Sequence, residues 1–171
     1  ASTFTGRVVA STGADPFMAA TAAYCALTGP LHGGAPGPVL DMLDAIATRE
    51  NIAPWIDAAL ARGERLMGFG HRIYKVRDPR AEALLSALAA AGADRRFVVD
   101  APAQVAEATG LRANIDFALA VLSRTLSLPA GSEIALFAVA RSAGWLAHAI
   151  EQRRTGRLLR PASVYLGAMP A

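Results

Sequence analysis

The chain has 171 residues, of which 53% are hydrophobic, and it carries a formal net charge of +3 with an isoelectric point near 9.6. This length suffices for one domain with a substantial core, and no run approaches the roughly 18 to 20 apolar residues of a membrane helix, so we expect a soluble protein with no membrane partner. The basic residues are scattered and Lys75 is the one lysine, which argues against nucleic acid as a partner and favours small anionic ligands recognised by arginine.

The single cysteine, Cys25, lies in an apolar stretch and has no second cysteine with which to form an internal disulfide. We therefore expect a small core side chain in a reducing, cytoplasmic compartment. The chain opens at Ala1 without a basic and apolar leader, which does not indicate secretion, and its abrupt start suggests that an amino-terminal part precedes it.

Helical periodicity recurs from end to end, and no alternating β-branched run is long enough to require a sheet, so the sequence predicts an all-α fold. Asp15 and Asp78 each precede a proline, a pattern typical of helix starts. The expected helices are 4–11, 16–27, 38–48, 54–62, 79–91, 102–109, 115–126 and 132–152, with irregular segments at 64–77 and 153–171.

A glycine-rich segment, Gly-Pro-Leu-His-Gly-Gly-Ala at 29–35, places His32 just before a predicted helix start. The positive end of the helix dipole disfavours imidazolium, so we expect a neutral histidine that donates a hydrogen bond, as a developing enolate oxygen requires. A loop histidine that bonds only to the backbone is an equally weighted alternative.

The segment 68–75 combines two glycines with a histidine and cations. Gly68 and Gly70 could turn successive backbone N–H groups toward an anion, while Arg72 and Lys75 add positive charge. We interpret this segment as a phosphate-contacting loop, and the alternative is a plain turn.

Two arginines occupy positions that call for an anionic partner. Arg80 lies in the first turn of a predicted helix, where the dipole repels cations, so a bound carboxylate is one expectation and pairing with Glu82 or solvent is the other. Arg141 shares a helix face with Phe137 and Trp145, which predicts a buried guanidinium paired with a ligand anion or with a glutamate of the same helix. His148, on the same side as Arg141, is expected to be structural.

Asp116 stands between two large apolar residues in Asn-Ile-Asp-Phe. Partial desolvation would raise its basicity, as a general base for a C–H bond requires. The alternative is that it caps a helix.

Taken together, Gly-Pro-Leu-His-Gly-Gly-Ala, Gly-Phe-Gly-His-Arg-Ile-Tyr-Lys with Asp-Pro-Arg, Asn-Ile-Asp-Phe, Arg-Ser-Ala-Gly-Trp-Leu-Ala-His and Leu-Arg-Pro follow the order seen in citrate synthases. The resemblance covers essentially the whole chain. It implies the carboxyl-terminal half of an all-α, citrate-synthase-like fold, with residues 32–127 as a small domain carrying the CoA and catalytic motifs. Residues 1–31 and 128–171 would be part of the large, dimerisation domain.

The resemblance also implies residue roles. His32 resembles the histidine that hydrogen-bonds the acyl-CoA thioester oxygen, Asp116 the base that removes the methyl proton, and His71 the histidine that polarises the keto carbonyl of oxaloacetate. Arg80 and Arg141 resemble the arginines that clamp the oxaloacetate carboxylates. The remaining implied contacts are Arg160, contributed across the dimer to oxaloacetate, and Gly68, Phe69, Gly70, Arg72 and Lys75 along coenzyme A.

The implied reaction condenses acetyl-CoA, or propionyl-CoA, with oxaloacetate to give citrate or 2-methylcitrate, with coenzyme A as product, no metal, no permanently bound cofactor and a cytoplasmic homodimer. A citryl-CoA lyase and a non-catalytic binding or assembly module are the alternatives. The sequence departs from the family at Pro36-Gly37-Pro38 and at Ala118-Leu119-Ala120, where the family usually has a Ser-Gly pair. The family's additional oxaloacetate-binding histidine lies before Ala1, so a chain of this length is expected to hold an incomplete site.

Overall fold

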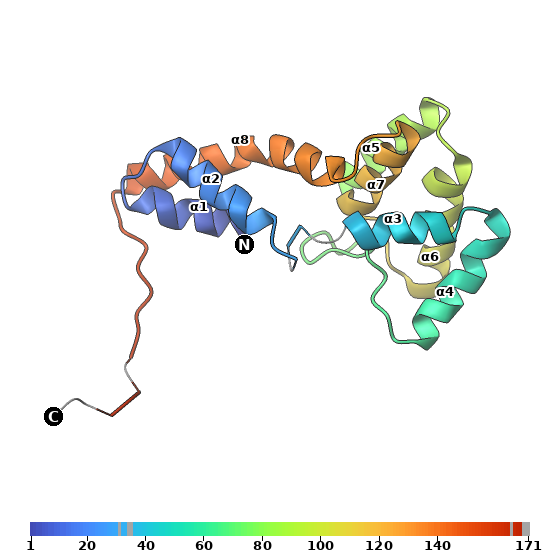
Figure 1. Cartoon of the computed structure of the whole chain (residues 1–171), viewed down its shortest axis with the longest axis horizontal. Coiled ribbons are helices and arrows are strands. Elements are labelled where there is room, and N and C mark those ends of the chain that lie inside the picture. Colours follow the sequence, from blue (N-terminus) through green and yellow to red (C-terminus); the bar gives the residue numbers. More distant parts are fainter. Residues whose placement is uncertain (31, 34–35, 165, 169–171) are drawn as a thin grey trace. The chain divides into compact units, whose positions relative to one another are not determined.

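A computed structural model describes residues 1–30, 32–33, 36–164 and 166–168 of the chain. Over these residues the structure is built from helices, with one isolated β-bridge between Phe69 and Ala113, which confirms the all-α prediction (Figure 1). None of the helices in this part of the chain is long and apolar enough to cross a membrane. The α-helices are α1 (Ser2–Ser11), α2 (Pro16–Leu27), α3 (Pro36–Ala45), α4 (Ile52–Ala61), α5 (Pro79–Ala90), α6 (Ala101–Thr109), α7 (Ile115–Thr125) and α8 (Ser132–Thr155).

Most helix ends lie within a few residues of the predicted ones, because proline and capping side chains define them locally. Asp15 accepts a hydrogen bond from the backbone N–H of Phe17 at 2.8 Å at the start of α2. Two short elements were not expected, a 3₁₀ turn at Arg49–Asn51 and a π-helical turn at Arg96–Asp100. The second carries Phe97 into the core, a tertiary requirement that the local pattern does not reveal.

The described chain divides into two compact units, and the first comprises residues 1–27 and 140–171. In this unit α1 and α2 lie side by side (Figure 1), and they pack closely against each other at Gly6. A Cβ atom at Gly6 would lie 3.2 Å from the carbonyl oxygen of Ala19 and 3.3 Å from the Cβ of Ala23. Glycine is therefore needed here for close helix packing. The carboxyl-terminal part of α8 completes the unit, where the indole of Trp145 donates to the hydroxyl of Ser2 at 3.2 Å.

Hydrogen bonds tie the segment after α8 back to the helices of this unit. The buried side chain of Gln152 accepts from the guanidinium of Arg7 at 2.7 Å and donates to the carbonyl of Arg157 at 3.0 Å. The backbone N–H of Leu159 donates to the hydroxyl of Ser11 at 3.0 Å. The start of the non-helical tail is therefore held in place even though it forms no helix.

The second unit comprises residues 28–139 and contains α3 to α7 with the beginning of α8. Its core is formed mainly by apolar side chains of α3, α4, α5 and α7. Phe117 of α7 is completely buried, and its ring centroid lies 4.9 Å from that of Phe69. The segment between α4 and α5 therefore contributes to the core although it is not helical.

Cys25 is exposed on α2, so the expectation of a small core side chain is wrong. The buried positions of α2 are Ala19, Ala23 and Leu27, which are spaced four residues apart on one face. Cys25 lies outside this row, because a position two residues from a buried one points to a different side of a helix.

Candidate active site

The buried carboxylate of Asp78 defines the start of α5 and the position of Arg80. Asp78 is 2% exposed, and its oxygens accept from the backbone N–H of Arg80 at 3.1 Å and from Nε and Nη2 of the Arg80 guanidinium at 2.9 and 2.8 Å. Arg80 therefore has a charge partner in the first helical turn. The alternative that Arg80 pairs with Glu82 is wrong, because Glu82 accepts from Arg77 at 3.1 Å instead.

The same carboxylate also reaches the start of α7. Oδ2 of Asp78 accepts from the backbone N–H of Ile115 at 3.1 Å. Asn114 caps α7, since its side-chain oxygen accepts from the backbone N–H of Asp116 at 2.9 Å, while its amide nitrogen donates to the carbonyl of Gly70 at 2.8 Å. The alternative that Asp116 is the helix cap is therefore wrong, and its carboxylate is not occupied by that role.

The pKa of Asp78 is shifted by competing effects. Burial on its own would raise the pKa, but the hydrogen bonds and positive charge of Arg80, together with the N–H of Ile115, outweigh burial and lower it. The ion pair in turn raises the pKa of Arg80. Both groups are therefore charged at neutral pH.

Two backbone N–H groups of the glycine segment before His71 are bonded within the protein and do not face an anion. The N–H of Phe69 donates to the carbonyl of Leu66 at 3.3 Å, and the N–H of Gly70 donates to the carbonyl of Arg112 at 2.8 Å, so both donors are used within the protein. Gly68 has a φ of +83°, and a Cβ there would lie 3.0 Å from core side chains. The glycines serve backbone geometry and close packing, and Phe69 is a core residue, 4% exposed.

His71, at the end of this segment, faces hydrogen-bond donors on both ring nitrogens. Nδ1 is 3.0 Å from the backbone nitrogens of both Ile73 and Tyr74, which donate to it. A neutral imidazole that accepts at Nδ1 carries its proton on Nε2. Nη2 of Arg80 lies 3.4 Å from this Nε2. Two N–H donors therefore meet at one place, and an oxygen acceptor from a ligand could bond to both.

Asp116 is half-buried beside this pair of donors. Its pKa is raised, chiefly because burial disfavours the charged carboxylate, and the charge of Asp78 adds to the rise. Arg80, His71 and His32 act in the opposite direction and lower it. His71 and Arg80, 3.4 Å apart, therefore lie with His32 and Asp116 in the second unit, where the charges of all three influence the Asp116 carboxylate.

Arg72 and Lys75, the predicted contacts to the phosphates of coenzyme A, have exposed side chains. Lys75 borders a cavity of about 150 Å³ that is also lined by Gly70, His71, Tyr74, Asp78 and residues 110–114. Lys75 and His71 therefore share one depression of the surface.

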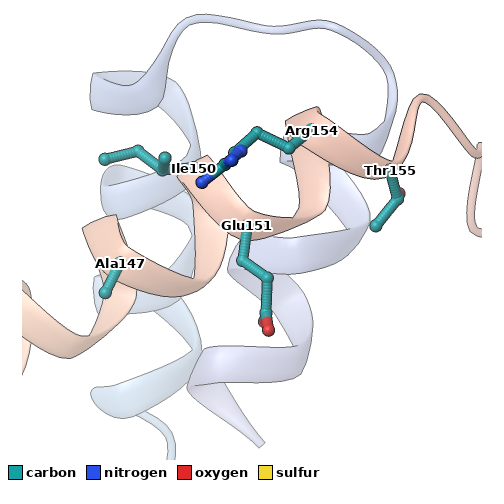
Figure 2. A pocket seen from close by; sticks show the side chains of 5 residues that line it. All are labelled: Ala147, Ile150, Glu151, Arg154 and Thr155. Atoms are coloured by element: carbon teal, nitrogen blue, oxygen red, sulfur yellow. The ribbon is translucent and has the colours of Figure 1, made fainter.

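A cavity of about 370 Å³ elsewhere is a weaker candidate. Its five lining residues all come from α8, and Figure 2 shows Ile150, Glu151 and Arg154 among the side chains that border it. It contains none of the predicted catalytic or binding residues. We therefore place the candidate site at His71 and Asp116.

Arg141 and Arg160, the other two predicted arginines, belong to the first unit. Arg141 is exposed, so the prediction of a buried guanidinium is wrong. Its side chain lies along Gly144, which has no Cβ to exclude it, and its Nη2 donates to the hydroxyl of Thr3 at 2.7 Å. Arg160 is exposed on the non-helical tail.

His148 agrees with its structural interpretation, since its Nδ1 lies 3.2 Å from a guanidinium nitrogen of Arg7.

Three residues of this site were not identified as functional from the sequence. The carboxylate of Asp78 links two helix starts, the side chain of Asn114 links α7 to the segment before His71, and the ring of Tyr74 lies against both His71 and Arg80. Asp78 was predicted to mark a helix start, and Asn114 could have been noted as a helix cap. The contacts that they make across the fold leave no signal in a single sequence.

Comparison with known proteins places this geometry in a family. The family model for the citrate synthase carboxyl-terminal domain matches residues 1–162. Among curated relatives, the citrate synthase of Synechocystis sp. is 43% identical over 98% of this chain, and 2-methylcitrate synthase 1 of Corynebacterium glutamicum is 42% identical over 98%. The matches cover 44% and 45% of those relatives, so the chain spans about half the length of the curated relatives it matches.

Solved structures give the same result. The citrate synthase of Thermotoga maritima superimposes with a TM-score of 0.83 at 37% identity, over 100% of this chain and 49% of that one. A ternary complex of the Thermoplasma acidophilum citrate synthase with carboxymethyl coenzyme A and oxaloacetate has a TM-score of 0.78 at 34% identity, with the same coverage. The citryl-CoA lyase of Hydrogenobacter thermophilus, 23% identical with a TM-score of 0.79, shares the fold. The chain therefore belongs to the citrate synthase family and corresponds to its carboxyl-terminal domain.

Proposed function

We propose that the protein to which this chain belongs condenses a short acyl-CoA, acetyl-CoA or propionyl-CoA, with oxaloacetate to give citrate or 2-methylcitrate and free coenzyme A. The observation that carries the proposal is the convergence of two donors, Nε2 of His71 and Nη2 of Arg80, beside the half-buried carboxylate of Asp116. A keto acid supplies the oxygen atoms that such donors bind, and an acyl-CoA supplies an acidic C–H bond for the carboxylate.

The first step of the proposed reaction is enolisation. Asp116 removes a proton from the carbon next to the thioester carbonyl; the electron pair of the broken C–H bond forms the carbon–carbon double bond, and the carbonyl π pair moves to the thioester oxygen. The raised pKa of Asp116 supports this role, since a more basic carboxylate is a better acceptor for a carbon-bound proton. His32 would donate a hydrogen bond to the oxygen on which charge develops.

The second step forms the carbon–carbon bond. The enol carbon attacks the keto carbon of oxaloacetate, and the keto oxygen gains negative charge, which the N–H of His71 stabilises. Arg80 would bind a carboxylate of the same molecule and so fix the direction of attack. Water then hydrolyses the thioester, which releases coenzyme A and the tricarboxylic acid.

Arg141 and Arg160 would supply further carboxylate contacts, Arg160 from the second subunit of a homodimer. Their exposure in this chain is compatible with such a role, because a guanidinium that awaits an anion must be accessible. We assign residues 1–31 and 128–171 to the large, dimerisation domain and residues 32–127 to the small domain, and we expect the enzyme in the cytoplasm.

Coenzyme A would lie along Gly68, Phe69 and Gly70 with its phosphates near Arg72 and Lys75. The two exposed cations and the adjoining cavity of about 150 Å³ support this placement. The backbone N–H groups of Phe69 and Gly70 do not contribute, because both donate within the protein.

Thiol release by the full-length protein tests the proposal. Acetyl-CoA and propionyl-CoA are each incubated with oxaloacetate, and free coenzyme A is followed with a thiol reagent. We expect release that requires oxaloacetate, and the two rates identify the preferred acyl group. A separate incubation with citryl-CoA tests the alternative. Cleavage of citryl-CoA without net condensation would instead indicate a lyase. Binding of oxaloacetate without release from either thioester would indicate a non-catalytic module.

A further inference from the structure

The aromatic ring of Tyr74 contacts both of the donors that define the candidate site. Its centroid lies 4.8 Å from the imidazole of His71 with the planes tilted by 35°, and Cζ of Arg80 lies 5.0 Å from the same centroid. Because Nη2 of Arg80 and Nε2 of His71 are 3.4 Å apart, the three side chains form one mutually contacting group. We infer that Tyr74 is a positioning residue that holds His71 and Arg80 in the arrangement that binds the keto acid, an inference that rests on the proposed function.

Tyr74 acts on His71 in two separate ways. Its backbone N–H donates to Nδ1 at 3.0 Å, which favours the proton on Nε2, and this bond is independent of the side chain. Its ring packs against the imidazole and limits the tilt of the histidine plane. A substitution at Tyr74 therefore removes the second restraint and leaves the first.

The ring also supplies the restraint on Arg80 that Asp78 cannot supply. Asp78 bonds to Nε and Nη2 at the edge of the guanidinium, so it fixes the group within its own plane. The Tyr74 ring lies against the Arg80 guanidinium in a cation–π contact. The Asp78 bonds at the edge of the guanidinium and the Tyr74 ring at its face together hold the group in one orientation. A two-point contact to a carboxylate requires such a fixed orientation.

Tyr74 lies at the surface, so its substitution should affect substrate binding without lowering the stability of the fold. The side chain is 38% exposed and borders the cavity of about 150 Å³ together with His71, Lys75 and Asp78. Its removal therefore creates no closed cavity in the core. A loss of activity without a loss of stability is the expected signature.

The test uses full-length protein with the variants Tyr74→Ala, Tyr74→Phe and Val76→Ala. Val76 belongs to the same segment and is 80% exposed, so its truncation controls for a general disturbance of this loop. We expect Tyr74→Ala to raise the KM for oxaloacetate about tenfold, since an aromatic pair and a cation–π contact are both lost. The KM for acyl-CoA and the melting temperature should stay near those of the unchanged protein. Tyr74→Phe keeps the ring and should restore the KM to within about twofold, and Val76→Ala should have no effect.

Each outcome separates this inference from the proposed function. Unchanged oxaloacetate KM in Tyr74→Ala, with an active parent enzyme, would overturn the positioning role alone. A rise in the KM for acyl-CoA only would overturn it as well and would place the ring in the coenzyme A site. Failure of Tyr74→Phe to restore the KM would show that the hydroxyl group, and not the ring, is required. Absence of thiol release by the parent enzyme would refute the proposed function itself.

Discussion

The buried carboxylate of Asp78 accepts a hydrogen bond from the backbone N–H of Ile115 at 3.1 Å, across a separation of 37 residues. Through this bond and its contacts to Arg80, one side chain joins the amino termini of α5 and α7. The first helix start carries a predicted oxaloacetate ligand, and the second carries the predicted base, Asp116. The relative position of the two groups therefore depends on Asp78.

Replacement of Asp78 by alanine should reduce both stability and substrate binding. It removes a helix cap, worth about 1 kcal/mol, and leaves Arg80 without its partner. Because the Arg80 side chain is 40% exposed, solvent compensates part of the lost ion pair, and we expect a total loss of about 2 kcal/mol in the free energy of unfolding. Urea titration of the full-length protein measures this loss. An equal KM for oxaloacetate in variant and parent would contradict the linking role.

The pH dependence of stability offers a second test of Asp78. Its folded-state pKa is lowered, so the contribution is complete above the ordinary aspartate pKa of about 3.9 and is lost as the pH falls through the folded value. Asp78→Asn lacks this contribution at every pH. The stability difference between the two proteins should be largest near neutral pH and should shrink in acid. A difference that stayed constant down to the acid transition would argue against the charged pair.

Gly68 and Gly92 form a matched pair for a test of the segment before His71. Both have a positive φ, +83° and +82°, but a Cβ at Gly68 would lie 3.0 Å from core side chains, whereas a Cβ at Gly92 would meet open space. Gly92→Ala should cost about 1 to 2 kcal/mol for the left-handed backbone alone. Gly68→Ala should cost about 1 to 3 kcal/mol more, because the core is overpacked. Equal losses in urea titration would mean that close packing at Gly68 is unimportant.

The effect of the α7 cap on stability can be distinguished from its effect on catalysis by comparison with the cap of α2. Asn114→Ala removes the bond to the N–H of Asp116 and the bond to the carbonyl of Gly70. We expect a loss of about 2 kcal/mol in stability and a fall in kcat, since Asp116 loses its fixed position. Asp15→Ala, which removes the corresponding cap of α2, should reduce stability by about 1 kcal/mol. It should leave the kcat unchanged relative to that of the parent. A kcat for Asn114→Ala similar to that of Asp15→Ala would show that Asn114 is not needed to position Asp116 for catalysis.

Local features of the fold could be read from the sequence. The Asp-Pro pairs at Asp15 and Asp78 predicted the starts of α2 and α5, because capping involves neighbours within a few residues. The exposure of Cys25 and Arg141 was missed, since which face of a helix is covered depends on the elements that pack against it. The close packing at Gly68 was missed for the same reason, as its neighbours Phe117 and Val39 come from distant parts of the chain.

The candidate site shows the same division. His71, Arg80 and Asp116 were singled out from motifs, and the role proposed for His71 came from the resemblance to citrate synthases. The contact of the Tyr74 ring with Arg80 and the bond from Ile115 to Asp78 arise only when separate segments fold together. The sequence determines these long-range contacts, but they cannot be recognised in a single sequence.

Asp116 should be dispensable for stability although it is proposed as the base. Burial raises its pKa, so the folded state holds the proton more tightly than the unfolded state, and ionisation near neutral pH costs stability. Asp116→Asn removes that cost, and the free energy of unfolding at pH 7 should be unchanged or slightly higher. The difference from the parent should narrow as the pH falls toward the ordinary aspartate pKa. A clear loss of stability at pH 7 would mean that the carboxylate is mainly structural.

The most direct test of the account is the rate of thiol release from acyl-CoA by full-length protein and by its Asp116→Asn variant, each with saturating oxaloacetate. Loss of a general base should lower kcat by about 10² to 10⁴, while binding of oxaloacetate, measured by calorimetry, should remain close to that of the parent. A variant that releases coenzyme A as fast as the parent would contradict the assignment of Asp116 and the mechanism built on it.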